Sequence, residues 1–213
     1  MFSSNPKTVL VLAPHTDDGE FGCGGSIAKF VRQGARVVYV AFSAAEQSVL
    51  PHLPRDILRT EVVAATGTLG IKSEDCIVLD YEVRRFPEFR QSILDKMIDL
   101  SKRYSPDLVL LPSINDAHQD HQTIAQEGFR AFKRVTMLGY EVPWNNLDFR
   151  TSCFVSLDEE ELGLKIDSLS KYQSQSHRVY ATEEFIKSLA ITRGVQIGKN
   201  YAECFEVVRW VVN

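Results

Sequence analysis

Three short apolar runs along the chain have the pattern of buried β-strands. They cover residues 8–12, 36–42 and 107–111, are rich in β-branched side chains, and have nearly continuous rather than alternating apolar positions. Strands of a parallel sheet show such runs because helices cover both of their faces. The pattern therefore predicts parallel strands at these three places.

Segments with helical spacing of apolar residues separate and follow these runs. In residues 26–33, Ile27, Phe30 and Val31 recur at helical spacing, and Gly34 then provides a stop. The same reasoning places further elements along the chain. It predicts helices at residues 55–69, 92–104, 123–134, 162–172 and 183–193, and strands at 76–79, at 204–212 and within 145–157.

This alternation of strands and helices is typical of an α/β fold, in which a mostly parallel sheet is flanked by helices. A chain of 213 residues supports one substantial core, and no linker, repeat or low-complexity tract interrupts it. We therefore expect a single domain over residues 1–213.

Composition and charge exclude several classes of protein. A chain that is 44% hydrophobic and 24% charged is neither disordered nor collagen-like. Its 24 Lys+Arg and 28 Asp+Glu give a net charge of −4, so we expect no nucleic-acid partner. The cysteines are far apart and without a Cys-x-x-Cys pair, as expected for reduced thiols. The apolar run at residues 9–13 is too short for a signal peptide or a membrane span, so we expect a cytoplasmic protein.

The loop after the first predicted strand carries His15, Asp17 and Asp18, followed by the glycine-rich residues 22–25. In open parallel sheets, ligands bind at the carboxyl ends of the strands. An imidazole and a carboxylate suit a first-row metal, and a neighbouring carboxylate that does not bind the metal can act as a base toward water. We expect the glycines to let the backbone approach a ligand closely.

The loop after residues 107–111 carries Asp116, His118, Asp120 and His121. Both loops open at the same edge of a parallel sheet, so one site can draw on both. The spacing of the two histidines allows one imidazole to face a metal and the other to face bound substrate. A carboxylate beside a histidine raises its pKa and favours an imidazolium that donates a proton. Asp120 or Asp116 can act in this way, which makes Asp120 a candidate catalytic residue.

Each loop also has a purely structural explanation. Aspartates before a helix commonly cap it, and the His/Asp turn can cap the helix predicted at residues 123–134. The glycines alone are weak evidence for nucleotide binding, because they lack the spacing of the dinucleotide fingerprint. Taken together, the two loops favour a metal-dependent catalytic site.

The paired loops resemble a known enzyme family. His-Thr-Asp-Asp at residues 15–18, the glycine pair at 24–25 and His-Gln-Asp-His at residues 118–121 resemble the motifs of the PIG-L/LmbE-like family of zinc-dependent N-acetyl-sugar deacetylases. Similarity extends to other segments and covers nearly the whole chain. These segments are residues 61–71, 165–175 and 193–205. The last one looks most like family members associated with bacterial surface-polysaccharide sugars.

The resemblance implies a three-layer, Rossmann-like α/β fold and one zinc ion per chain, with other divalent metals as alternatives. It implies that His15, Asp18 and His121 hold the metal. It also implies Asp17 as the general base, and His118 as the group that stabilises the oxyanion and protonates the leaving amine. The implied reaction is hydrolysis of the N-acetyl group of an amino sugar, either an N-acetylglucosamine-type glycoside or a nucleotide-linked sugar.

Candidate substrate contacts come from two parts of the chain. Arg84 and Arg85 follow the strand predicted at residues 76–79, where guanidinium groups can bind an anionic ligand bidentately. A solvated basic surface explains these arginines equally well. Further candidates lie in the family-like segments, and the resemblance implies that they line the pocket. They are Tyr172, Gln175, Arg193 and Glu203.

Two other functions stay open at this point. One is a non-catalytic sugar-binding relative, because a fold does not fix a function. The other is a zinc amidase that acts on a non-sugar N-acyl small molecule. In the main hypothesis the partner is a small N-acetylated sugar, and the sequence does not indicate an oligomeric state.

Overall fold

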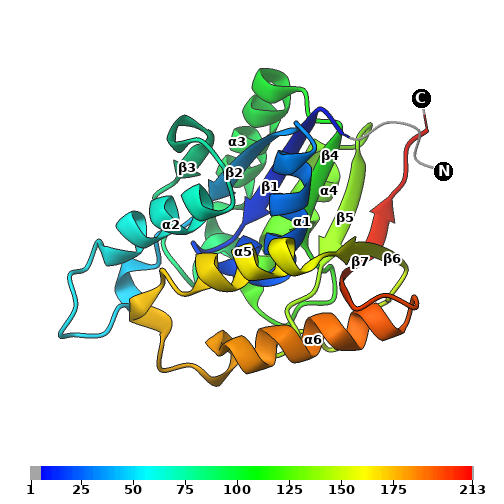
Figure 1. Ribbon diagram of the computed structural model, residues 1–213. Helices are drawn as coiled ribbons and strands as arrows, with labels where there is room; N and C mark the ends of the chain where they lie inside the picture. Colours follow the sequence, from blue (N-terminus) through cyan, green and yellow to red (C-terminus); the bar gives the residue numbers. More distant parts are fainter. Residues whose placement is uncertain (1–5, 213) are drawn as a thin grey trace.

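The computed structural model describes residues 6–212, and within that range the strands form one seven-stranded sheet. The strand order is β3-β2-β1-β4-β5-β7-β6 (Figure 1). Strands β1 to β5 pair in parallel, whereas β7 is antiparallel to β5 and β6 is antiparallel to β7. The strand bounds are β1 Thr8–Ala13, β2 Arg36–Ala41, β3 Cys76–Val78, β4 Leu108–Pro112, β5 Thr136–Tyr140, β6 Cys153–Leu157 and β7 Tyr201–Arg209.

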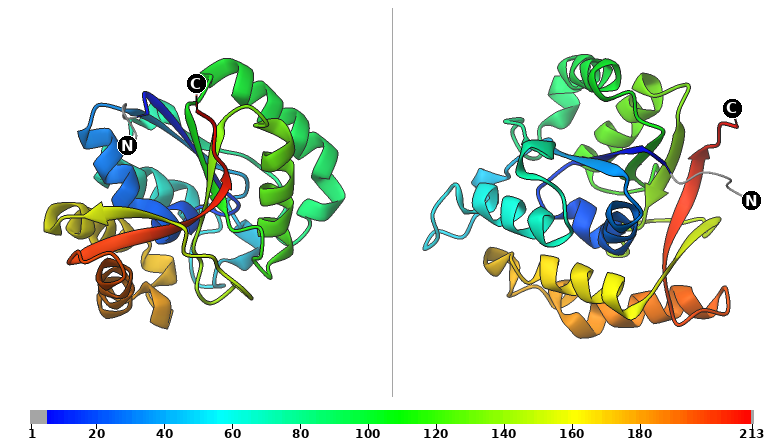
Figure 2. Two further views of the ribbon diagram at one scale, coloured as in Figure 1. Left: turned by 90° about the vertical axis from the view of Figure 1, so that its right-hand side faces the viewer. Right: turned by 45° about the horizontal axis from the view of Figure 1, so that its top comes forward.

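Helices cover both faces of this sheet, so the fold has three layers. Helices α1, α2 and α5 lie on one face, and α3 and α4 lie on the other (Figure 2). Helix α6 packs beside α5 and against β7. The helix bounds are α1 Asp18–Arg32, α2 Ile57–Thr68, α3 Arg90–Tyr104, α4 Gln119–Ala131, α5 Glu159–Leu169 and α6 Glu183–Val195.

Alternate residues of β1 supply two separate cores. Val9 and Val11 pack into the apolar cluster beneath α1, α2 and α5, while Leu10 and Leu12 pack into the cluster beneath α3 and α4. All of these side chains are fully buried. Each buried side chain of this size contributes about 1.5–3 kcal/mol. A polar residue at any of these positions would lose that contribution, which explains the continuous apolar run.

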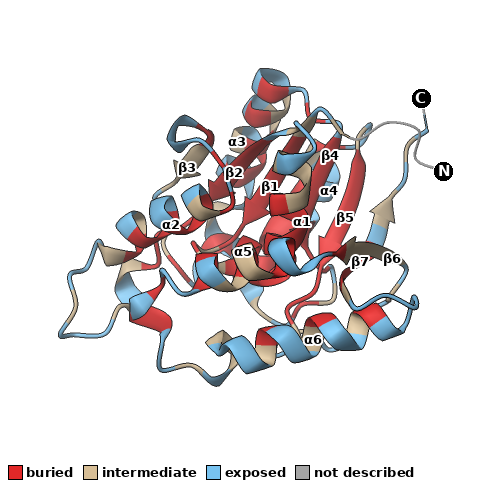
Figure 3. Cartoon of the chain, in the orientation of Figure 1, coloured by how far each residue is buried: buried red, intermediate tan, exposed pale blue. Residues whose placement is uncertain are grey.

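The outer faces of the helices are exposed to solvent, in contrast to the buried sheet (Figure 3). Within residues 6–212, no helix combines the length and apolar character needed to cross a membrane. The cysteines at positions 23, 76, 153 and 204 are free thiols, as the sequence indicates.

The predicted fold class is confirmed, and the runs at residues 8–12, 36–42 and 107–111 are the parallel strands β1, β2 and β4. The sequence pattern does not predict β5. That strand is only five residues long and contains Gly139, so its apolar run is short and interrupted. The last strand, β7, begins at Tyr201 rather than at residue 204.

Helix α1 begins at Asp18, well before the predicted start at residue 26. The glycines were expected to let the backbone approach a ligand closely, but the structure places them in α1 against other elements of the fold. A Cβ atom on Gly22 would lie 2.3 Å from Cδ2 of Tyr140, and one on Gly25 would lie 2.4 Å from Cδ1 of Leu157. These glycines let α1 pack closely against β5 and β6.

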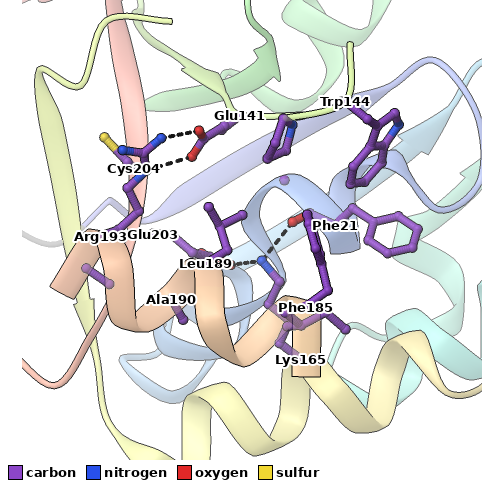
Figure 4. A pocket seen from close by; sticks show the side chains of 14 residues that line it. Phe21, Glu141, Trp144, Lys165, Phe185, Leu189, Ala190, Arg193, Glu203 and Cys204 are labelled. Atoms are coloured by element: carbon purple, nitrogen blue, oxygen red, sulfur yellow. Dashed lines mark hydrogen bonds and ion pairs between the residues drawn. The ribbon is translucent and has the colours of Figure 1, made fainter. Parts of the chain in front are cut away.

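Helix α1 is kinked at Cys23, whose backbone angles (φ −149°, ψ 24°) are not helical. A buried ion pair lies at the kink, with Nζ of Lys165 2.6 Å from Oε1 of Glu203 (Figure 4). Before the kink, Nζ of Lys165 donates to the backbone carbonyl of Phe21, at a distance of 2.7 Å. Glu203 accepts the backbone N–H groups of Gly25 and Ser26 after it, at 2.9 and 2.7 Å. The pair thus supplies hydrogen bonds that the interrupted helix cannot make internally.

Replacing Glu203 by Gln should lower the free energy of unfolding by about 3–5 kcal/mol, because the buried charge of Lys165 then has no counter-charge. Chemical denaturation followed by circular dichroism measures this change. Glu88→Gln is the matched control, since Glu88 pairs with Arg85 at the exposed surface and such pairs contribute about 0–1 kcal/mol. Equal losses of stability in both variants would contradict the role given to the buried pair.

Candidate metal and catalytic site

The two motif loops meet where the strand order of the sheet changes direction. Strand β1 continues through α1 to β2 on one side, whereas β4 continues through α4 to β5 on the other. In open α/β sheets, ligands bind outside the carboxyl ends of the strands at such a point. The structure brings His15 from the first loop and His121 from α4 together at this edge.

One carboxylate oxygen, Oδ2 of Asp18, lies at the centre of the cluster. It is 3.1 Å from Nδ1 of His15 and 3.2 Å from Nε2 of His121. The backbone N–H of His15 donates to the same oxygen at 2.7 Å. Asp18 therefore fixes both the imidazole and the backbone of the loop that follows β1.

Carboxylates on the far side of the two histidines orient their rings. Oδ2 of Asp116 lies 2.7 Å from Nδ1 of His121, and Oδ2 of Asp120 lies 3.0 Å from Nε2 of His15. Each contact fixes which ring nitrogen faces the centre of the cluster. Carboxylates support metal-binding histidines in the same way in metalloproteins.

These donor atoms fit a divalent metal ion. Among the described residues, a carboxylate oxygen and imidazole nitrogens from His15, Asp18 and His121 lie within 4.8 Å of one another. This donor set is typical of open catalytic sites for zinc and other first-row metals. The ligand atoms of His15, His118 and Asp120 also lie within 4.8 Å of one another. The carboxylate of Asp120, however, already accepts backbone N–H groups from another loop, so the first set suits a metal better.

The adjacent aspartates Asp17 and Asp18 have different environments. Burial alone would raise the pKa of Asp18, but the positive charges of His121 and His15 hold it well below its usual value. Burial and the negative charge of Asp18 raise the pKa of Asp17 to about 6. Asp17 belongs to neither group of potential metal ligands. The two carboxyl groups are thus suited to different roles.

His118 lies beside the cluster, and no carboxylate of the described residues pairs with its ring. Its Nδ1 accepts the backbone N–H of Asp120 at 3.2 Å, which caps α4, so the proton of the neutral ring is on Nε2. Burial and the positive charges of His15 and His121 lower the pKa of His118. Asp120 and Asp116 were expected to support a neighbouring histidine, and they do so for His15 and His121 rather than for His118.

Buried hydroxyl groups support the loop after β1 from behind. The carbonyl oxygen of Thr16 accepts the hydroxyl groups of Tyr39 and Tyr172 at 2.8 and 2.7 Å. Both tyrosines also contact the carboxyl group of Glu20, and burial raises the pKa of Glu20 to about 8. The structure thus places Tyr172 in the interior, beneath the loop that carries Asp17.

A cavity of about 340 Å³ opens over the cluster. This volume is suited to a small-molecule ligand. The candidate metal ligands and catalytic side chains from both loops line it, with the exception of the buried Asp120. The lining residues from the two motifs are His15, Asp17, Asp18, His118 and His121.

The predicted substrate contacts are divided between different places. Arg84 and Gln175 line the cavity. Arg85 forms ion pairs with neighbouring glutamates at the surface and does not line it. Arg193 and Glu203 are held in ion pairs and line a smaller neighbouring pocket instead (Figure 4). Only part of the predicted set can therefore reach a ligand above the cluster.

Comparison with known proteins identifies the family. Residues 10–132 match the PIG-L family, described as GlcNAc-PI de-N-acetylase. The chain belongs to this family. The matched region contains both motif loops, so the resemblance inferred from them is confirmed.

Relatives of this PIG-L family member include proteins with different names. The uncharacterized deacetylase YaiS of Escherichia coli K12 is 27% identical over 174 residues, which cover 79% of this chain and 91% of YaiS. The structure of N,N′-diacetylchitobiose deacetylase from Pyrococcus horikoshii has a TM-score of 0.81 at 22% identity and covers 96% of this chain and 84% of that chain. A 4-oxalmesaconate hydratase of Pseudomonas putida is 29% identical over 126 residues, or 54% of this chain and 47% of the hydratase.

Arg178, Tyr180 and Trp144 also line the cavity, although no motif in the sequence indicated them. The rings of Trp144 and Tyr180 are stacked, with centroids 3.9 Å apart and planes at 12°. The guanidinium group of Arg178 lies over the ring of Tyr180, 5.5 Å from its centroid. For Arg178 and Tyr180, the sequence offered one indication of a place near the site: they lie within residues 176–180, which directly follow the family-like segment that ends at Gln175.

Replacing Asp116 by Asn should weaken divalent-metal binding by about 10–100-fold, because His121 loses the carboxylate that orients its ring. Competition with a chromophoric zinc chelator measures the affinity. The control is Asp99→Asn, an exposed position on α3 that should leave the affinity unchanged. Wild-type affinity in the Asp116 variant would contradict a metal bound through His121.

Proposed function

We propose that this PIG-L family member is a zinc-dependent N-deacetylase that removes the acetyl group from an amino sugar. One observation carries the proposal: a His/Asp/His donor set and a further carboxylate, Asp17, lie at one cavity. Membership of a family described as a de-N-acetylase supports the reaction. The names of YaiS and of the Pyrococcus horikoshii protein support it as well.

Zinc bound by His15, Asp18 and His121 would supply a Lewis acid that polarises the acetyl carbonyl and lowers the pKa of the attacking water. Asp17 accepts the proton that this water loses while its oxygen bonds to the carbonyl carbon. Asp17 is suited to this step because it lines the cavity and is not needed as a ligand.

His118 stabilises the oxyanion through Nε2–H, since its Nδ1 is occupied by a backbone N–H. A donor of this kind contributes about 3 kcal/mol to the transition state. When the C–N bond breaks, the proton held by Asp17 passes to the amine nitrogen. Acetate and the free amino sugar are the products, and water is the only other reactant. In this scheme Asp17 returns the proton to the amine, whereas the family resemblance implies His118 for that step, because Nε2–H of His118 is engaged with the oxyanion.

Side chains around the cavity support a sugar as substrate. The amides of Gln175 and Asn145 offer donors and acceptors for hydroxyl groups, and both residues line the cavity. The stacked rings of Trp144 and Tyr180 add an apolar surface beside them. A pocket with few polar groups on an apolar wall orients a small ligand.

Acetate release from N-acetylated compounds tests the proposed function. Zinc-loaded protein should release acetate from at least one of a set of free, glycosylated and nucleotide-linked N-acetylhexosamines. Chelation should abolish the release, and added zinc should restore it. Release only from non-sugar N-acetyl amides would identify an amidase of a different class. No release from any compound, with stoichiometric zinc bound, would contradict deacetylation.

Asp17→Asn should reduce kcat by about 10²–10⁴-fold, because the attacking water loses its proton acceptor. Bound zinc, measured by atomic spectroscopy, should stay at the wild-type level. Asp167→Asn, at an exposed position on α5, is the control and should keep full activity. Wild-type turnover in the Asp17 variant would contradict its role as base, and loss of zinc would place it among the ligands instead.

A further inference from the structure

Two arginines, Arg84 and Arg178, line the cavity that contains the metal-ligand cluster. They come from different parts of the chain, one after β3 and the other after α5. Elsewhere in the fold many arginines are neutralised: Arg85 pairs with nearby glutamates, Arg90 with Glu127, and Arg193 with Glu141. Neither cavity arginine pairs with a carboxylate of residues 6–212.

The contacts that these two guanidinium groups do make are few. Nη2 of Arg84 lies 3.5 Å from the hydroxyl of Ser48, at the limit of a hydrogen bond. Nη1 of Arg178 donates to the hydroxyl of Tyr180. Nε of Arg178 is buried, yet no hydrogen-bond partner for it exists among the described residues. A buried N–H group without a partner costs free energy, and a bound ligand that accepts it removes this cost.

The backbone of Arg84 is held in an unfavourable conformation at this place. Its φ angle is +69°, in the left-handed region that residues other than glycine rarely adopt. Its N–H donates to Oδ2 of Asp120 at 2.6 Å, and the same oxygen lies 3.0 Å from Nε2 of His15. Its carbonyl accepts the side-chain amide of Gln119 at 3.3 Å. The contacts that orient a metal ligand thus also fix Arg84, and strain of this kind is typical of functional sites.

Arg178 is fixed by an aromatic pair. Its guanidinium group lies over the ring of Tyr180, which stacks on Trp144. The acidic residues that line the cavity are Asp17 and Asp18, within the described part of the chain. Both have roles in the proposed reaction, and a bound divalent metal would offset their charge. The charge of Asp17 also acts on Arg178, but the cavity presents to a ligand two guanidinium groups that form no ion pair within the described residues.

We propose that the substrate carries an oxyanion group, a phosphate or a carboxylate, which binds to Arg84 and Arg178 beside the N-acyl group. This inference rests on the proposed deacetylation and narrows its substrate to an anionic N-acylated amino sugar. Guanidinium groups match oxyanions because their fork of N–H donors binds two oxygen atoms at once. The buried Nε of Arg178 is one of the donors that the oxyanion satisfies.

Binding to zinc-loaded Asp17→Asn protein, measured by calorimetry, tests the inference without turnover. The ligands are N-acetylglucosamine, its 1-phosphate, and N-acetylmuramic acid, which carries a carboxylate. At least one anionic sugar should bind about 10- to 100-fold more tightly than N-acetylglucosamine. Whichever of the two anionic sugars binds more tightly shows whether the preferred oxyanion is a phosphate or a carboxylate.

Arginine variants in the same background locate the anion. Arg84→Met and Arg178→Met should each lower the ratio of anionic-sugar to neutral-sugar affinity by about tenfold or more. The affinity for the neutral sugar should stay unchanged. Arg178→Lys should recover only part of it, because Lys keeps the charge but lacks the fork. Arg85→Met, next to Arg84 but outside the cavity, is the control and should retain the preference. Thermal melts establish that all variants fold.

Two outcomes would overturn the inference. One is equal affinity for neutral and anionic sugars. The other is an anionic preference that survives when Arg84→Met and Arg178→Met are combined in one protein, which would place the anion on the metal instead. Because these are binding measurements, they stand even where no acetate release is found in active protein, and that absence would count only against the proposed deacetylation.

Discussion

The whole site depends on the carboxylate of Asp18, which joins the loop after β1 to the first turn of α4. A single oxygen contacts a backbone N–H and the imidazoles of His15 and His121. Those segments approach one another because β1 and β4 are neighbours in the sheet. Asp18 reaches them because α1 starts immediately after the loop and packs closely through Gly22. Parallel pairing and one short side chain thus set the geometry of the candidate metal centre.

The sequence was informative where the determining contacts are local. Buried parallel strands produce apolar runs, and the residues that follow such strands lie at the ligand-binding edge, so His15 and His121 could be placed together. Local pattern could not show that Gly22 faces Tyr140, because these residues are distant in sequence and meet only after folding. The same applies to the pairing of Asp120 with His15 instead of His118. Arg178 follows no periodic pattern, so only the folded chain shows that it lines the cavity.

Residues beyond the region of the family match support the site from behind. The match ends at residue 132, yet Tyr172, Lys165 and Glu203 all contact α1 or the loop before it. Two of these were expected to contact substrate because they lie in family-like segments. Their burial shows another reason for a particular side chain at such positions, namely support of the backbone that carries Asp17 and Asp18.

The contacts of Glu203 with α1 also bear on how the molecule is assembled. They join residues 177 and 178 positions apart, and the contact between Tyr172 and Thr16 spans 156 positions. Contacts between distant residues form late, because a long loop must close before they stabilise anything. During synthesis, β1 and α1 leave the ribosome long before β7 exists. The motif loop can therefore acquire its final support only after β7 has been made, so the candidate metal site is completed late in folding.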